Sequence, residues 1–424
     1  MLTPEIYKKY IAILEEELVP AMGCTEPISL AYAAALARKT LGALPEKTQL
    51  TVSANIIKNV KSVVVPHTGN LRGIEAAAAA GIVAGDADSE LEVLSHVTQE
   101  ETAAIREYLK RAEISLRTSD GDFVFDIQVL VSAEGHSAFV RIAGNHTNVI
   151  RIERDAQVLL SRDYVQTGQT QQTDRSILNV EDIITFADTA AIEDVREVLD
   201  RQIRFNTAIA REGLRGNWGA SIGKVLLNAY GDSVHNQAKA MAAAGSDARM
   251  SGCELPVVIN SGSGNQGLTA SLPVIVYAEH LKASQELLYR ALLVSNLITI
   301  HLKTGIGCLS AYCGATSAGC GAGAGITYLY GGKAREISHT VVNAVAINSG
   351  MICDGAKASC AAKIASAVEA GLLGMQMQFQ GTEFYGGDGI VVKGVENTIN
   401  NVGRLARVGM AETDKEIIQI MTGC

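Results

Sequence analysis

The chain has 424 residues with 47% apolar and 5% aromatic side chains, 41 glycines and eight cysteines. This length predicts more than one domain, and the scarcity of aromatic residues favours closely packed helices over an aromatic-rich β-sandwich. The formal net charge of −9, with no block of basic residues, argues against a nucleic-acid partner.

The first ten residues are polar and lack the basic and apolar regions of a signal peptide. No apolar run reaches the roughly 18 residues that a membrane span needs. We therefore expect a cytoplasmic protein without membrane contact, in a compartment that keeps thiols reduced. The eight cysteines are then available as metal ligands, nucleophiles or packing residues.

Helix and strand patterns alternate through the first 163 residues. Apolar residues at helical spacing predict helices, and β-branched residues in alternation predict strands. The predicted helices cover 4–19, 27–41 with Thr25 as N-cap, 74–84 and 99–111. The predicted strands lie within 48–66 and at 91–97, 113–118, 123–132 and 137–152. This mixture predicts an α+β domain over residues 1–163.

A polar stretch without periodicity at 164–175 predicts a linker. Helical patterns follow it almost to the end, interrupted by glycine-rich loops. They cover 180–187, 190–212, 219–243, 273–281, 284–302, 338–348, 358–372 and 413–421. The predicted fold class is therefore α+β, with N-terminal helices and a small sheet domain followed by a mostly helical domain at 176–424.

Five cysteines gather in one glycine- and alanine-rich region, at positions 308, 313, 320, 353 and 360. Their spacings are not the tight pairs of zinc ribbons and ferredoxins, and they suit an iron–sulfur cluster held between separate loops. Three thiolates on a four-iron cluster leave one iron open as a Lewis acid. On spacing alone these cysteines could equally be buried packing residues.

Four further residues are candidates for the site. Cys24 precedes a predicted helix, whose dipole and free N–H groups favour a thiolate and would bind a carboxylate. His67, Lys303 and Lys357 are candidate bases or carboxylate binders. Each of the three could equally be an ordinary loop or helix-end side chain, so the general base stays open.

Two segments and a loop resemble the catalytic part of iron–sulfur L-serine dehydratases. Residues 302–320 resemble the first cluster-binding segment of that family, and 350–355 resemble the second, with Gly355 in place of a proline. Residues 255–273 resemble its substrate loop. The resemblance implies cluster ligation by Cys313 and Cys353.

The whole chain resembles the L-cysteine desulfidase family, single-chain relatives of those dehydratases. The shared motifs, in order, are Met22 to Pro27, His67 to Asn70, Ser261 to Gly267 and Cys353 to Lys357. The resemblance implies a [4Fe–4S] cluster and β-elimination of L-cysteine to pyruvate, ammonia and hydrogen sulfide.

The resemblance also implies roles for individual residues. Cys360 and Cys24 both belong near the cluster, and which of them is the third ligand stays open. The cysteines at 253, 308 and 320 remain packing or neighbouring thiols. The candidates to hold the substrate carboxylate are Thr25, Thr68, Asn70, Ser261, Ser263, Asn265 and Gln266.

Other functions are compatible with the sequence. An L-serine dehydratase would share the mechanism and differ in the leaving group. A pyridoxal-phosphate lyase would use the 261–267 loop as a phosphate cradle and Lys357 for the aldimine. A non-enzymatic protein would bind iron or thiols as a sensor.

Two expectations concern the chain as a whole. Cys424 carries both groups of the substrate, a thiol and a carboxylate, so it could cap the open iron or be a frayed terminus. The apolar helices are compatible with a homodimer.

Overall fold

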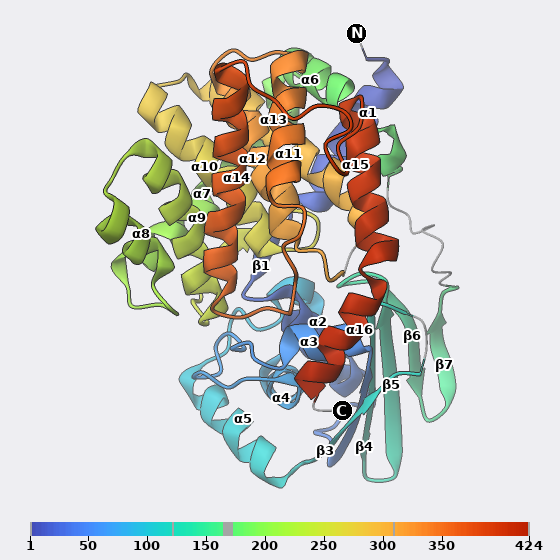
Figure 1. Cartoon of the computed structure of the whole chain (residues 1–424). Helices are drawn as coiled ribbons and strands as arrows, with labels where there is room; N and C mark the ends of the chain where they lie inside the picture. The colour runs from blue at the N-terminus through green and yellow to red at the C-terminus, as the bar shows by residue number, and fades with distance from the viewer. Residues whose placement is uncertain (1, 121–122, 164–172, 308–309, 423–424) are drawn as a thin grey trace.

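A computed structural model describes residues 2–120, 123–163, 173–307 and 310–422. Figure 1 shows a sheet with a few helices in the lower half and a large bundle of helices above it. Each half has its own hydrophobic core. The predicted α+β class is confirmed.

The lower half is built on a six-stranded sheet of order β3-β2-β4-β5-β6-β7. Only β2 and β3 run parallel; the other neighbours are antiparallel. The strands are β2 (Lys47–Val52), β3 (Glu113–Thr118), β4 (Asp126–Ala133), β5 (His136–Ala143), β6 (Val149–Arg154) and β7 (Gln157–Ser161). Alternation along β4 buries Ile127, Val129 and Val131, which join the core beneath the helices.

The helices of this half cover the sheet and the cavity described below. Helix α2 lies against β4 and β5, and α4 packs on α2. The elements are α2 (Thr25–Leu41), α3 (Ala54–Val60), α4 (Ile74–Ala84), the 3₁₀ turn η1 (Ala87–Glu92) and α5 (Gln99–Arg111). The close packing of α2 on α4 depends on Gly81, because a Cβ there would lie 2.0 Å from the carbonyl oxygen of Ala31.

Three strand predictions in this half were wrong in part. Residues 54–60 form α3, and only Val64 in 62–66 makes a single bridge, to Arg72. Residues 91–92 are the end of η1, whose first residues are capped by the Asp86 side chain, and 93–96 form turns after it. The stretch 137–152 divides into β5 and β6, since the Asn145 side chain accepts from the Thr147 N–H and bends the chain there.

The upper half is a bundle in which α12 is surrounded by α10, α11, α13 and α14 (Figure 1). Its first helices are α1 (Pro4–Glu17), α6 (Val180–Thr189), α7 (Ile192–Arg215), α8 (Ile222–Tyr230), α9 (Val234–Met250) and α10 (Gly264–Leu281). The others are α11 (Gln285–Ile306), α12 (Gly314–Leu329), α13 (Ala334–Ile347), α14 (Cys360–Phe379), α15 (Val395–Arg404) and the π-helical turn η3 (Leu405–Gly409). Helix α16 (Ala411–Thr422) then runs down into the lower half and contacts α3 (Figure 1). Among the described residues no helix is long and apolar enough to cross a bilayer.

Helix α1 belongs to the upper half, unlike the predicted division at residue 163. Its buried face, with Tyr10 and Ile13, lies in the core of the helical bundle, and the Tyr10 and Phe186 rings are 5.1 Å apart. The chain then crosses to the lower half through β1 (Pro20–Met22), which pairs antiparallel with β8 (Pro256–Val258). This crossing places the start of α2 at the junction of the two halves.

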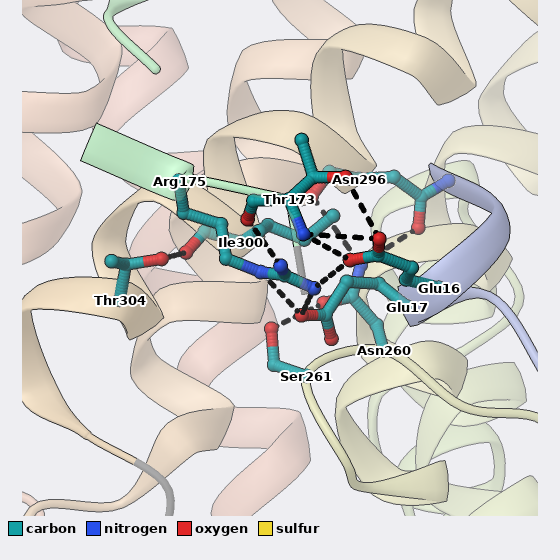
Figure 2. Close-up of polar contacts among 9 residues, drawn as sticks. All are labelled: Glu16, Glu17, Thr173, Arg175, Asn260, Ser261, Asn296, Ile300 and Thr304. Atoms are coloured by element: carbon teal, nitrogen blue, oxygen red, sulfur yellow. Dashed lines mark hydrogen bonds and ion pairs between the residues drawn. The ribbon is translucent and has the colours of Figure 1, made fainter. Parts of the chain in front are cut away.

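A partly buried ion network holds the chain where it enters the bundle (Figure 2). The Glu16 carboxylate accepts from the backbone N–H and the hydroxyl of Thr173. Arg175, whose side chain is mostly buried, pairs with Glu16 and Glu17 at 2.8 Å. Of the predicted linker 164–175, residues 164–172 lie outside the described residues, and 173–175 are fixed to the end of α1.

Helix α12 was not among the predicted helices. A Cβ on Gly319 would lie 2.2 Å from the carbonyl oxygen of Ala367 on α14, and one on Gly323 would lie 2.6 Å from that of Gly371. The small residues thus permit close helix packing and do not form a flexible loop. Helix α15 was not predicted either, and 219–243 is divided at Gly231, whose φ is +80°.

Substitution Gly319→Ala is expected to lower the free energy of unfolding by about 2 kcal/mol, because the added methyl group forces α12 and α14 apart. The control is Gly350→Ala, where a Cβ meets no atom within 4 Å, so the change should stay within about 0.5 kcal/mol. Urea unfolding of both variants measures the difference. Equal losses in the two variants would contradict the packing role of Gly319.

Candidate active site

A cavity of about 110 Å³ lies at the junction of the two halves, where the starts of α2, α12 and α14 approach the end of α9 and the loop after β8. This volume is well above what a single water needs. Four cysteines line it: Cys24, Cys313, Cys353 and Cys360. The structure therefore brings together all four thiols that the sequence proposed as cluster ligands.

Local structure explains how the thiols come together. Cys24 and Cys313 are the N-cap residues of α2 and α12, and Cys360 opens α14. The segment before α14 runs beside the start of α12, since Cys313 N–H donates to Met351 at 3.0 Å and Cys353 N–H donates to Ala311 at 2.6 Å. These two bonds hold Cys313 and Cys353 side by side.

The thiols of Cys313 and Cys353 interact directly. The hydrogen bond from Cys313, together with the charges of Lys58 and Lys303, lowers the pKa of Cys353 despite its burial. The same hydrogen bond and burial raise the pKa of Cys313. This corner of the cavity therefore favours one negative charge on the pair.

Cys24 differs from the prediction that its helix N-terminus would favour a thiolate. Burial raises the pKa of Cys24 to about 12, and the nearby charge of Arg249 only partly opposes this. The side chain is 1% exposed, with its Sγ 3.9 Å from the sulfur of Met250. Desolvation outweighs the helix dipole here.

The donor set fits an iron–sulfur cluster. Cysteine thiolates are the usual ligands of such clusters, and each one binds a different iron, so the sulfur atoms need not converge on one point. Within the described ranges, no three His, Cys, Asp or Glu side chains are gathered closely enough to hold a single ion. Lys58 and Lys303 on the cavity wall would compensate the negative charge of thiolate ligands.

The loop after β8 forms another wall. Ser261, Ser263, Asn265 and Gln266 all line the cavity, as the sequence proposed for substrate binding. Thr25 does not line it; its hydroxyl donates to the carbonyl oxygen of Gly262 at 3.0 Å and ties α2 to the loop.

Two buried side chains at the cavity were not predicted, His146 and Arg249. His146 lies in the turn between β5 and β6, with its Nε2 buried and without a hydrogen-bond partner among the residues that the structure describes. Arg249, at the end of α9, donates from Nη1 to Asn265 at 3.1 Å, while its Nε has no partner within the described part of the chain. Buried polar atoms are rarely left unpaired in native structures, so both point to a bound ligand.

Burial lowers the pKa of His146, and the charge of Arg249 lowers it further, against the opposing effect of Glu26. The imidazole is therefore neutral near pH 7 and able to accept a proton. His146 was missed because the turn from Asn145 to Asn148 was predicted as part of a continuous strand over 137–152. Arg249 was missed because α9 was predicted to end at residue 243.

A family model described as serine dehydratase alpha chain matches residues 88–419. The chain belongs to this serine dehydratase alpha chain family. Related chains are similar over almost their full length. A UPF0597 protein of Desulfitobacterium hafniense (strain Y51) is 60% identical over 98% of this chain and 96% of its own. UPF0597 proteins of Lachnoclostridium phytofermentans and Treponema denticola are 50% and 44% identical, each over 98% of this chain and over 100% and 98% of their own.

Membership of the serine dehydratase alpha chain family supports a lyase-type activity on an amino acid and an iron–sulfur cofactor. The matched span contains Cys313, Cys353 and Cys360 together with His146 and Arg249. Cys24 lies before it and within the chain that the relatives cover almost completely.

Other residues proposed for this family site lie elsewhere. His67, Thr68 and Asn70 do not line the cavity, and His67 Nδ1 is 3.3 Å from the Glu254 carboxylate at a separate pocket. Thr68 is buried, with its hydroxyl bonded to the Val65 carbonyl, whereas Asn70 is exposed. The loop packs against α5, because the Thr102 hydroxyl donates to the His67 carbonyl.

The two lysines proposed as bases differ in position. Lys303 lines the cavity and donates to the Gly307 carbonyl at 2.5 Å. Lys357 does not line it and is paired with Asp354 at 2.5 Å, so the cavity offers no support for an aldimine at this lysine.

The remaining cysteines fall into two groups. Cys253 and Cys320 are buried away from the cavity, and burial raises the pKa of both thiols. Cys308 and Cys424 lie outside the described residues.

Proposed function

We propose that this protein is an iron–sulfur L-cysteine desulfidase, which eliminates sulfide from L-cysteine to give pyruvate and ammonia. The observation that carries the proposal is the convergence on one cavity of four cysteine thiols, a buried arginine whose Nε has no partner among the described residues, and a neutral buried histidine. These are the groups that β-elimination from a small amino acid needs.

In this proposal Cys313, Cys353 and Cys360 hold a [4Fe–4S] cluster. Cys360 is the third ligand in this proposal because it opens α14 directly after the segment that carries Cys353, whereas the buried Cys24 thiol lies against the sulfur of Met250. Cys24 lines the same cavity beside these three residues. When bound, the cluster supplies a Lewis-acidic iron that takes up the charge of the departing sulfide.

The protein side chains have separate tasks. Arg249, fixed by Asn265, presents its free Nε–H to the substrate carboxylate, and such charge-assisted bonds are the strong ones. His146 accepts the α-proton at Nε2, as its lowered pKa leaves it unprotonated. Burial of the cavity strengthens both interactions. The aminoacrylate that leaves hydrolyses to pyruvate and ammonia in water.

A second candidate is L-serine dehydration by the same residues, which membership of the serine dehydratase alpha chain family favours. The two reactions differ in the leaving group, water or sulfide. The thiol of L-cysteine is a softer ligand than the hydroxyl of L-serine and binds iron better, so L-cysteine is the preferred substrate in this proposal.

The test is sulfide and pyruvate release from L-cysteine by protein reconstituted anaerobically with iron and sulfide, beside an iron-free sample and parallel reactions with L-serine. We expect iron-dependent release of sulfide and pyruvate in equal amounts. Pyruvate release from L-serine but not from L-cysteine would assign the protein as an L-serine dehydratase instead. Binding of iron without any turnover would favour a sensor, and equal release without iron would contradict the iron–sulfur mechanism.

A further inference from the structure

Three fully buried amides connect the helical bundle to the cavity loop: Gln202 on α7, Asn296 on α11 and Asn260 after β8. Gln202 and Asn296 face each other through two hydrogen bonds of 2.9 and 2.8 Å. Asn260 Nδ2 donates to Asn296 Oδ1 at 3.0 Å, a contact in the network of Figure 2. None of the three side chains lines the cavity itself.

The orientation of this chain of amides is set at one end. Asn296 Nδ2 donates to the carbonyl oxygen of Leu292 at 2.9 Å, and a carbonyl oxygen can only accept. Asn296 Oδ1 must therefore face Gln202 and Asn260, so Asn260 presents its Nδ2 to it. The oxygen of Asn260 is left to accept the Ser261 hydroxyl at 2.8 Å.

Ser261 needs such support because its φ is +50°, a left-handed conformation that non-glycine residues rarely adopt. Strained residues of this kind persist only where the surroundings fix them. Asn260 also exchanges two backbone hydrogen bonds of 3.1 Å with Ser263. The loop is thereby closed between two residues, with the Ser261 side chain on the cavity wall.

We infer that Asn296 is a positioning residue, which acts through Asn260 to hold the 261–263 loop in the form that receives the substrate carboxylate. The inference deepens the proposed function and rests on it for the identity of the substrate. The loop backbone approaches His146 closely, since a Cβ on Gly262 would lie 3.2 Å from the ring. A displaced loop would therefore disturb the space between His146 and Arg249.

The test compares Asn296→Leu with Asn343→Leu in the full-length reconstituted protein. Asn343 on α13 is equally buried and its amide also bonds backbone groups, of Gly374 and Phe384, but it has no link to the cavity. We expect about tenfold faster hydrogen–deuterium exchange in residues 260–266 and an about tenfold higher KM for L-cysteine in Asn296→Leu, with kcat changed less. Asn343→Leu should change neither.

Gln202→Leu is the second variant, and it carries the test if Asn296→Leu does not fold. It leaves the hydrogen bond between Asn260 and Asn296 in place, so we expect smaller increases in loop exchange and in the KM for L-cysteine. Unchanged loop exchange, or faster exchange with an unchanged KM, would overturn the inference. If the wild-type protein turns over neither amino acid, the proposed function fails, and the exchange comparison alone decides whether Asn296 holds the loop.

Discussion

Cys353→Ala is expected to abolish cluster binding and to lower iron-dependent turnover by at least about 100-fold. Its thiol is the one whose pKa is lowered, by the hydrogen bond from Cys313 and the charges of Lys58 and Lys303, so it is best prepared to bind iron. The measurements are iron and sulfide content per chain after anaerobic reconstitution and sulfide release from L-cysteine.

The matched control is Cys320→Ala. Cys320 is an equally buried thiol on α12, but it lies outside the cavity, and burial raises its pKa to about 12. This variant should lose about 1 kcal/mol of stability from the small void and keep its iron. Full iron loading of Cys353→Ala, or equal loss of iron in both variants, would contradict the ligand assignment.

His146→Asn is expected to lower kcat by about 10²- to 10⁴-fold, the usual contribution of a positioned general base. In the wild-type protein kcat/KM should be level above pH about 6.5 and fall at lower pH. The rate falls on the acidic side because burial lowers the pKa of His146, so the ring stays neutral until the pH drops below the ordinary pKa of histidine. Steady-state rates from pH 5 to 9 at constant cluster loading measure both effects.

The control for this prediction is His136→Asn. His136 is exposed on β5 and pairs with Asp155 at 2.9 Å, away from the cavity. Its substitution should leave rate and pH profile unchanged. If His146→Asn keeps the acidic fall of kcat/KM, another group accepts the α-proton.

Sequence reasoning succeeded where a single local signal sufficed. Helices α4 and α5 were predicted to the residue from their helical residue patterns. The four lining cysteines were found from their glycine-containing segments together with the family resemblance, and Cys24 also from its place before a predicted helix. The α+β class followed from the change near residue 170, where mixed helix and strand patterns give way to helical patterns alone.

The sequence could not show contacts across the two halves. Arg249 and His146 are 103 positions apart and meet only because the turn after β5 reaches the end of α9 at the cavity. The His67 loop carries an equally suggestive motif, yet its packing on α5 directs it to another pocket. Helix α12 was missed because glycine has low helix propensity, which close packing against α11 and α14 overrides.

The placement of α1 in the core of the helical bundle has a consequence for dissecting this protein into fragments. Cutting the chain between residues 163 and 173 would leave α1 on the N-terminal piece, with Tyr10 and Ile13 stripped of their neighbours, and an open groove on the C-terminal piece. Each fragment would then expose apolar surface that invites aggregation. Co-expressed fragments should instead reassociate through α1, so split versions of this enzyme need both pieces synthesised together.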